Sequence, residues 1–317
     1  MQISEKQLII FDTDMDTDCD DVGALAMLLE AHKAQKIQLL SIISDSVCKY
    51  AAPCCEWIAK YYGVNVSVGT VYADDYLDSE ENRRRFERYR RYSKHCDEIG
   101  RSYNRIFAEE LGKLDKSYSS AKRIYRETLA KAEDGSVTVL CVGMLTGVYE
   151  ALASEADEIS SLSGKELFAR KVKRVITMGN PNCVNDFNWG MDAVATEGFF
   201  KLCPSPIYIS PNGEDVITGA HLTVSLDKMH PLRRAYEIWL GKKNMGRSSW
   251  DLIATLYAIN PYSEYLVYKE LNDFQYSAEK KSVLKQESRN RRYNLLHINR
   301  DIQEIERVLN AWMLGRF

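Results

Sequence analysis

A chain of 317 residues with 45% hydrophobic and 27% charged residues can bury a full apolar core, so it needs no disulfide framework to fold. Its formal net charge of −3 excludes the basic field by which proteins attract nucleic acid or an anionic membrane surface. No segment approaches the roughly 18 apolar residues of a membrane span, so we expect no nucleic acid and no membrane among its partners.

Apolar runs rich in β-forming residues alternate along the chain with segments of helical spacing. The runs are 8–11, 37–43, 64–68, 137–142, 172–178 and 206–209. The helical segments include 22–32, 54–62, 121–132, 193–202 and 302–314. This alternation predicts an α/β fold in which a single large domain, over 1–317, has a mainly parallel central β-sheet flanked by helices.

Two polar stretches interrupt the alternation. The first, at 74–105, combines arginines with aromatic residues, a composition that also occurs in nucleic-acid-binding segments. Acidic residues dilute its charge, so we interpret it as an exposed, polar helical insertion in the domain. The second, at 277–292, is basic and polar, and we expect a surface loop there.

The cysteines and the start of the chain bear on the cellular compartment. The eight cysteines mostly lie in apolar or element-like stretches and form no C-x-x-C pair, a pattern typical of reduced thiols. The start, MQISEKQLIIFD, passes from polar residues into an apolar run without the basic and long apolar regions of a signal peptide. We therefore expect a cytoplasmic protein without disulfides, although a signal peptide already removed would leave no trace in this sequence.

The most informative segment is 12–21, DTDMDTDCDD, which holds six aspartates directly after the apolar run 8–11. Two carboxylates about 6 Å apart repel each other by roughly 3 kcal/mol at an effective dielectric constant near 20. Asp20 and Asp21 suit a helix start, where each would contribute about 1 kcal/mol, but this cannot account for all six. A Ca²⁺ ion takes about 6–8 oxygen ligands, and we favour this explanation over a solvated acidic turn.

Two other protein classes have similar acidic loops. A haloacid-dehalogenase-like (HAD-like) Mg²⁺ phosphatase also ends a strand in D-x-D, but that family continues with Gly and then Thr or Val, where this chain has Met15 and Asp16. A non-enzymatic Ca²⁺-binding protein of the EF-hand type needs Gly at the sixth place of its loop and Glu at the twelfth. Those places hold Thr17 and Gly23, so both alternatives fit the sequence poorly.

The acidic segment resembles the signature of the nucleoside hydrolase family, the inosine-uridine type ribohydrolases, in which D-x-D follows a strand and D-D opens a helix. Here the D-x-D is 12–14 and the D-D is 20–21. The loop 15–19 between them is longer than in the best-known members, so Asp16 is an alternative to Asp14 for the first functional aspartate. Loops of the form DTDMxxDxDD also occur in the family, and they favour Asp14.

Further segments follow the family's order along nearly the whole chain. Residues 44–45, S-D, follow the second strand, where the family has Asn or Asp beside the ribose and base. The turn 142–147, V-G-M-L-T-G, is similar to x-G-P-L-T-N, with Met and Gly in place of Pro and Asn. Segment 178–188 contains M-G-N and D-F-N, which resemble M-G-G and E-F-N, with Asp186 in place of Glu. Residues 249–251, S-W-D, open a helix where the family has H-D or W-D.

The resemblance implies hydrolysis of the N-glycosidic bond of a ribonucleoside to ribose and free base, with Ca²⁺ as cofactor. The ion would bind the 2′- and 3′-hydroxyls of the ribose and activate the attacking water. Its ligands would be Asp14, Asp21, the carbonyl oxygen of Val142 and Asp251. Asp14, which would contact both the ion and the water, would be the general base.

The resemblance also assigns residues to the substrate. Asp20 and Asn188 would contact the 2′-hydroxyl. Asp186 and Asn180 would lie on the 5′ side of the ribose. These four side chains offer oxygen acceptors and amide donors, the groups that bind sugar hydroxyls.

The base end differs from that of pyrimidine-accepting members, because Trp250 stands where those members have His. An indole does not titrate as His does, but it can stack on a purine, and Asp45 would lie near the base. We therefore expect a purine nucleoside as substrate, and a role in purine salvage. Hydrolysis of another ribosyl compound on the same fold stays open, and so does assembly into a homo-oligomer, either a dimer or a tetramer.

Overall fold

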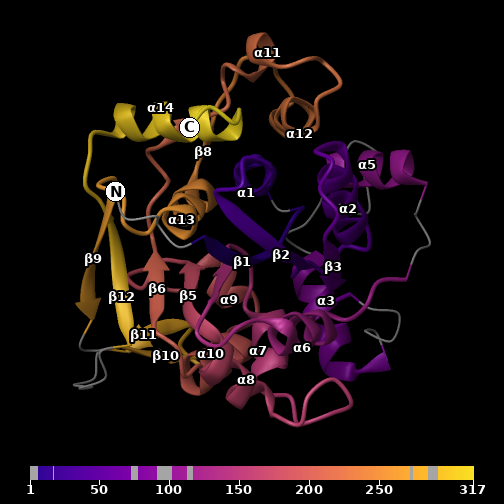
Figure 1. Ribbon diagram of the computed structural model, residues 1–317, viewed down its shortest axis with the longest axis vertical. Helices are drawn as coiled ribbons and strands as arrows, with labels where there is room; N and C mark the ends of the chain where they lie inside the picture. Colours follow the sequence, from indigo (N-terminus) through magenta and orange to yellow (C-terminus); the bar gives the residue numbers. More distant parts are fainter. Residues whose placement is uncertain are drawn as a thin grey trace.

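Eight of the described strands form one sheet through the middle of the molecule (Figure 1). Their spatial order is β3 (Ser67–Thr70), β2 (Ile37–Ser44), β1 (Gln7–Thr13), β4 (Val137–Cys141), β5 (Val172–Met178), β6 (Ile207–Ser210), β12 (Tyr293–Ile298) and β9 (Leu266–Leu271). All neighbouring pairs are parallel except β12 and β9, which are antiparallel. The structure is a computed structural model that describes residues 6–16, 18–72, 78–90, 102–112, 117–271, 274–284 and 292–317.

Helices cover both faces of this sheet (Figure 1). One face carries α1 (Asp20–Lys33), α2 (Ala51–Tyr61), α5 (Tyr103–Leu111), α12 (Pro231–Leu240), α13 (Trp250–Ile259) and α14 (Ile302–Met313). The other face carries α6 (Ala121–Lys131), α7 (Thr146–Leu152), α8 (Gly164–Lys171), α9 (Phe187–Met191) and α10 (Ala193–Leu202). The predicted α/β architecture, a mainly parallel sheet flanked by helices, is confirmed.

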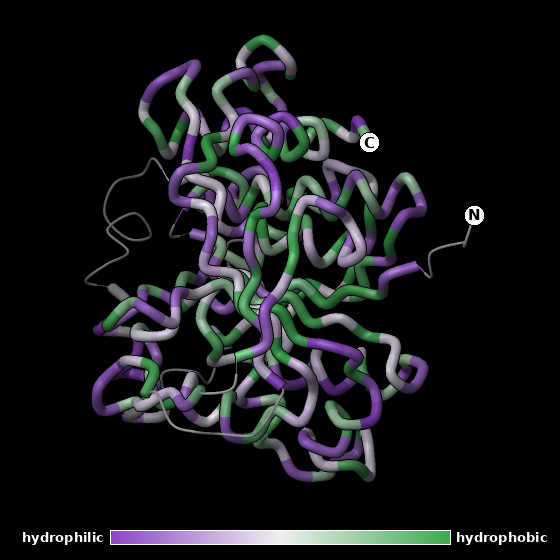
Figure 2. The backbone as a smooth tube through the Cα atoms, turned by 90° about the vertical axis from the view of Figure 1, so that its left-hand side faces the viewer, coloured by the Kyte–Doolittle hydropathy of each residue, from purple (hydrophilic) through white to green (hydrophobic). Residues whose placement is uncertain are grey.

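Strand β1 shows why both faces must be covered. Ile9 and Phe11 belong to the apolar core on the α1 side, whereas Ile10 belongs to the core on the α6 side. Successive side chains of a strand point to opposite faces, so a continuous apolar run needs a helix layer on each side. Figure 2 shows the result, with hydrophobic segments converging at the centre and hydrophilic ones at the periphery.

The structure differs from the predicted elements in three regions. The strand predicted at 64–68 begins only at Ser67, because Val64 closes the turn after α2 through a hydrogen bond from its backbone N–H to the carbonyl of Ala59. Strands β9 and β12 were not predicted, since most of β9 is exposed and lacks an apolar run. Part of the loop predicted at 277–292 is a hairpin of β10 (Gln275–Ser277) and β11 (Ser282–Leu284); residues 285–291 lie outside the described residues.

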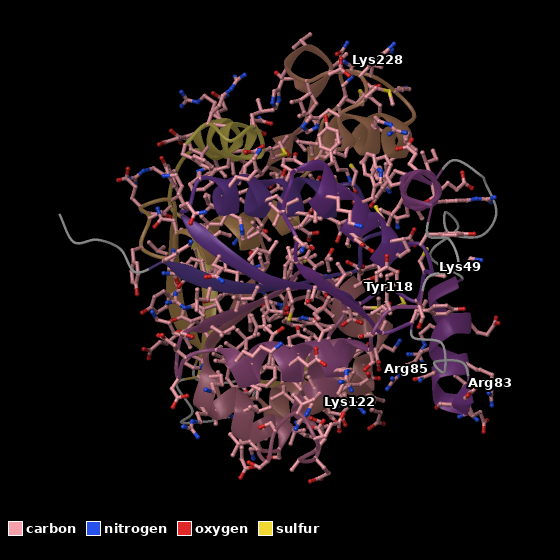
Figure 3. The ribbon with its side chains drawn as sticks, turned by 45° about the vertical axis from the view of Figure 1, so that its right-hand side comes forward. Lys49, Arg83, Arg85, Tyr118, Lys122 and Lys228 are labelled. Carbon is pink, nitrogen blue, oxygen red and sulfur yellow. The ribbon has the colours of Figure 1, made fainter. Side chains whose placement is uncertain are left out.

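The predicted insertion at 74–105 contains a helix, α3 (Glu80–Arg90), while 74–77 and 91–101 lie outside the described residues. Arg85 lies on the side of α3 that faces the body of the molecule, and Arg83 lies on the opposite side (Figure 3). The guanidinium of Arg85 is 3.0 Å from the carboxylate of Asp192. The arginines of this segment therefore include one that fastens the insertion to the rest of the domain.

The cysteines depart from the prediction at one position. Among the described residues, six cysteines are free thiols, but Cys48 takes part in a disulfide. The expectation of a chain without disulfides is therefore wrong at Cys48, which follows the end of β2. No helix in the described ranges has both the length and the apolar composition needed to cross a bilayer.

Candidate functional site

A cavity of about 400 Å³ opens at the carboxyl ends of β1, β4 and β5. Nine of the ten residues assigned from the sequence line it: Asp14, Asp20, Asp21, Val142, Asn180, Asp186, Asn188, Trp250 and Asp251. Parallel strands end at the same edge of a sheet, which is why motifs far apart in the sequence meet there. Asp45, the tenth residue, does not line this cavity.

Three buried aspartates form the floor of the site. Asp20 and Asp21 begin α1, and Asp251 lies in the first turn of α13. Each offers a carboxylate oxygen, and these oxygens all lie within 4.8 Å of one another. None of the three side chains is more than 3% exposed. The packing of α1 against α13 thus brings together acids that are about 230 positions apart in the chain.

Burial is the main cause of the electrostatic cost of this triad. Removal from water raises the pKa of Asp20, Asp21 and Asp251 well above its ordinary value. Repulsion from neighbouring acids adds to the effect, chiefly from Asp18 on Asp20, from Asp14 on Asp21, and from Asp20 on Asp251. Among the described residues, none of the three forms an ion pair with a Lys or Arg, so the site has a deficit of positive charge.

Asp14 and the backbone at Val142 are brought together by a close approach of two loops. Gly143 packs directly on Asp14, and a Cβ atom at position 143 would lie only 2.8 Å from the Cβ atom of Asp14. Only glycine permits this approach. The carbonyl oxygen of Val142 accepts a hydrogen bond of 2.6 Å from the side-chain amide of Asn188. The predicted ligand carbonyl and the predicted sugar-binding amide are therefore neighbours.

Asp14 lines the cavity in the structure, and its alternative, Asp16, does not. Asp16 is buried, does not line the cavity, and accepts a hydrogen bond of 3.1 Å from the side-chain amide of Asn104. The same amide donates to the carbonyl of Met15 at 2.8 Å. Asp12 also points away, because its carboxylate accepts a hydrogen bond from the hydroxyl of Tyr125. Asp14 therefore faces the cavity, and Asp12 and Asp16 support the loop.

Asp186 both lines the cavity and shapes its wall. Its carboxylate accepts hydrogen bonds from the backbone N–H groups of Asn180, at 3.0 Å, and Trp189, at 3.2 Å. It is thus the N-cap of α9 and ties down the loop that carries Asn180. Burial raises its pKa, although these backbone donors act in the opposite direction. Asp186 therefore caps α9 and also lines the cavity, as predicted from the sequence.

Asp45 lies in a second, much smaller pocket. One of its oxygens accepts a hydrogen bond of 2.9 Å from the backbone N–H of Gly147, and the other has no partner among the described residues. The pocket is also lined by Arg85, Thr146 and Asp192. Burial, followed by the charge of Asp12, raises the pKa of Asp45 well above its ordinary value. The structure thus does not bring Asp45 to the side chains predicted to bind the base.

Three charged residues that the sequence analysis did not assign also line the cavity: Asp18, Glu214 and Arg247. Asp18 accepts hydrogen bonds from Nε of Arg247, at 2.8 Å, and from Nη2, at 2.6 Å. Arg247 belongs to the short strand β8 (Arg247–Ser248), which pairs with β7 (Ile217–Thr218). Asp18 stood in the acidic segment and was a detectable candidate. No local pattern marked Arg247, because its partner is 229 positions away.

The position of Trp250 depends on a glycine turn. Gly213 has φ of +139°, and a Cβ atom there would lie 2.8 Å from the carbonyl carbon of Ser249. The carbonyl of Gly213 accepts a hydrogen bond of 2.9 Å from the backbone N–H of Ser249. A side chain at 213 would therefore push away the segment that places Trp250 and Asp251 at the start of α13.

Comparison with known proteins bears on the fold. No protein-family model and no curated protein sequence matches the chain. Among solved structures, an inosine-uridine preferring nucleoside hydrolase from Bacillus anthracis is 16% identical, with a TM-score of 0.65 over 98% of this chain and 100% of that one. A purine-preferring ribonucleoside hydrolase from Gardnerella vaginalis is 14% identical, with a TM-score of 0.66 over 98% and 99% of the two chains.

A third similar structure is of a different kind. The type III effector protein XopQ, in a crystal structure with adenosine diphosphate ribose, is 11% identical, with a TM-score of 0.64 over 100% of this chain and 93% of that one. At such low identity these likenesses establish architecture and not chemistry. The chain has a nucleoside hydrolase-like fold along essentially its whole length.

Proposed function

We propose that this chain is a Ca²⁺-dependent ribonucleoside hydrolase, which cleaves the N-glycosidic bond of a purine nucleoside to ribose and free base. The observation that carries the proposal is the cavity in which Asp14 faces the triad Asp20, Asp21 and Asp251. The nucleoside hydrolase-like fold supports the same reaction class.

The residues at the floor of the cavity fit a hard divalent cation. Three buried carboxylates lie within 4.8 Å of one another without an ion pair to a described cation, and a doubly charged ion would relieve their repulsion. Asp14, Asp21, Asp251 and the carbonyl of Val142 would supply the protein ligands, with Asp20 beside them. When bound, the ion would hold the ribose 2′,3′-diol and add positive charge next to the attacking water.

The chain's own side chains would perform the other tasks. Asp14 would take a proton from the attacking water as general base. The surrounding carboxylates would favour the positive charge that develops at C1′ as the bond to the base breaks. Asn188 would orient the 2′-hydroxyl, and the loop of Asn180 and Asp186 would contact the 5′ side of the ribose. Asp20, already hydrogen-bonded to the backbone N–H of Asp251, would also face the 2′-hydroxyl.

Release of ribose from a panel of nucleosides tests this function. The purified protein is assayed with inosine, guanosine, adenosine, uridine and cytidine, after chelation and again after Ca²⁺ is restored. We expect ribose release with purine nucleosides that stops on chelation and returns with Ca²⁺. Asp251→Asn, prepared in the same way, controls for contaminating hydrolases. Release that ignores the chelator, or turnover of p-nitrophenyl phosphate and no nucleoside, would contradict the proposal.

A second candidate is hydrolysis of another ribosyl compound at the same site. It is supported by the likeness to an effector protein whose structure contains adenosine diphosphate ribose, and by the guanidinium of Arg247 in the cavity wall. Adenosine diphosphate ribose therefore belongs in the panel, with its loss followed by chromatography. Its turnover without that of any nucleoside would favour this candidate over the first.

A further inference from the structure

Arg247 presents a fixed positive charge to the cavity wall beside Trp250. The centre of its guanidinium lies 5.0 Å from the ring centroid of Trp250 and 4.7 Å from that of Trp239. Contacts of this kind between a cation and the face of an indole are favourable, and here two indoles contribute to holding the guanidinium in place. The side chain is 30% exposed, so it is neither buried in the core nor free in solvent.

Asp18 pairs with the Nε and Nη2 edge of this guanidinium, and no other described residue pairs with the Nη1 edge. Nε and Nη2 of Arg247 both donate to the carboxylate of Asp18. Nη1 donates no hydrogen bond to any residue that the structure describes. Arginine carries its donors in a rigid fork, so the pairing with Asp18 also fixes the direction of Nη1. A donor with a set direction and no acceptor among the described residues is available to a bound molecule.

The proposed reaction needs such a donor. When the bond between C1′ and the base breaks, its electron pair moves to the base, so negative charge builds up on the ring nitrogens. The indole of Trp250 has no titrating proton with which to neutralise that charge. Arginine does not give up its proton either, but its charge and its hydrogen bond can stabilise the departing base.

A nucleoside whose ribose is held at the acidic triad would have its base near Arg247. Trp250 directly precedes Asp251 at the start of α13. A ribose held through its diol at Asp20, Asp21 and Asp251 would therefore lie close to Trp250. The polar loop of Asn180 belongs to a different wall, after β5, and suits the 5′-hydroxyl. Trp250 and Arg247 together thus offer an aromatic face and a directed cation, which match the π-system and the developing charge of a purine.

We propose that Arg247 is a catalytic residue that stabilises the leaving base, and that Asp18 is its positioning residue; this inference rests on the proposed hydrolase function. Asp14 removes a proton from water, and the resulting oxygen forms the new bond to C1′. The electron pair of the broken bond stays on the base, where Nη1 of Arg247 donates a hydrogen bond to it. The base then takes up a proton from solvent water, and Asp14 returns its own proton to solvent.

Two substrates with different leaving groups test the proposal. The leaving group of inosine is a purine anion that needs stabilisation, whereas the leaving group of p-nitrophenyl β-D-riboside is a phenolate that is stable without help. In Arg247→Met we expect kcat for inosine to fall about 10²-fold, as on loss of one donor to a developing anion. KM should change little, because the charge appears only in the transition state. Hydrolysis of the nitrophenyl riboside should be nearly unchanged.

Further variants keep the result interpretable. Asp18→Asn leaves the charge of Arg247 in place but loosens it, so the ratio of inosine to nitrophenyl riboside turnover should fall in the same direction and by less. Arg247→Lys provides a second test should the Met variant not fold. Arg123→Met removes an exposed arginine whose side chain pairs with Glu127 and Glu158 at the surface, and should leave both rates unchanged.

The outcomes separate this inference from the proposed function. A wild-type protein that hydrolyses neither substrate refutes the hydrolase itself. A wild-type protein that hydrolyses both, together with an Arg247→Met variant in which both rates fall equally, refutes only the role of Arg247 at the base, because a 5′-side contact or a structural role affects both substrates. An unchanged rate for inosine in that variant refutes it as well.

Discussion

Gly143 lies against Asp14 so closely that a methyl group at position 143 would stand 2.8 Å from the Cβ atom of Asp14. Gly143 follows β4, and Asp14 follows β1, the strand that pairs with β4. The contact joins two neighbouring loops at the edge of the sheet and sets where the carboxylate of Asp14 lies relative to the carbonyl of Val142. The place of the proposed general base is therefore decided by a residue with no side chain.

Gly143→Ala should displace Asp14 and lower kcat with nucleosides at least about 10-fold, since small displacements of a catalytic group are costly. Gly147→Ala, at the start of α7, is the matched control, because the three atoms nearest to its new methyl group belong to side chains and lie at 3.2 Å or more. Kinetics and thermal unfolding are measured for both variants. Equal activity losses in the two would argue against a special role for the contact at Asp14.

Asp14→Asn and Asp16→Asn should differ sharply. Asp14 lines the cavity, so its loss as general base should lower kcat about 10²- to 10⁴-fold. Asp16 is outside the cavity and is bonded to Asn104, so an amide there should keep most of the activity. Steady-state rates with inosine at saturating Ca²⁺ decide the matter, and a greater loss in the Asp16 variant would reverse the assignment.

Ca²⁺ should stabilise the folded chain, and more so at neutral than at acid pH. Burial raises the pKa of Asp20, Asp21 and Asp251 above the ordinary value near 3.8, so the ion-free folded chain binds more protons than the unfolded chain. The free energy of unfolding of the ion-free chain therefore falls as pH rises from the ordinary pKa of these aspartates through their raised pKa values. An ion at 100 times its dissociation constant would add about 2.7 kcal/mol, and protons compete with it at low pH.

Thermal unfolding with and without Ca²⁺, at about pH 5 and about pH 7.5, measures this effect. Asp251→Asn removes one buried charge, so it should raise the Tm of the ion-free protein at neutral pH and suppress the Ca²⁺-dependent increase. A Ca²⁺ shift that is the same in the variant and the wild type would place the ion elsewhere.

Trp250→His should reduce the preference for purine over pyrimidine nucleosides. Stacking of a base on an aromatic ring is worth about 1–3 kcal/mol, so a change of about 10-fold in the ratio of kcat/KM values is expected. The measurement compares inosine with uridine in both proteins. An unchanged ratio would show that the indole does not select the base.

Arg85 should hold the α3 insertion in place. It reaches the carboxylate of Asp192, which is only 6% exposed, so Arg85→Met leaves that charge poorly compensated. We expect a loss of about 2 kcal/mol in the free energy of unfolding and faster proteolysis within the insertion. Arg83→Met, on the outward side of the same helix, should change stability by less than about 0.5 kcal/mol (Figure 3). Similar losses in both variants would contradict a specific tether.

The sheet and its acidic edge could be predicted from the sequence because both depend on local patterns of residues. The apolar run of β1 had to be covered on two faces, and its abrupt change to aspartates had to lie at the end of a strand. The exposed strand β9 could not be predicted in this way, because it has no apolar periodicity. Its pairing with β12 at the edge of the sheet keeps it in place.

What the sequence determined by itself is the α/β architecture and a set of candidate acids and amides at one edge of the sheet. Only the tertiary structure decided which of them meet. It placed Asp251 beside Asp20, turned Asp45 toward a separate pocket, and joined Asp18 to Arg247. These relations depend on how helices far apart in the chain pack on a common sheet. A local pattern of residues carries no information about such packing, because it is settled by the fit of whole elements against one another.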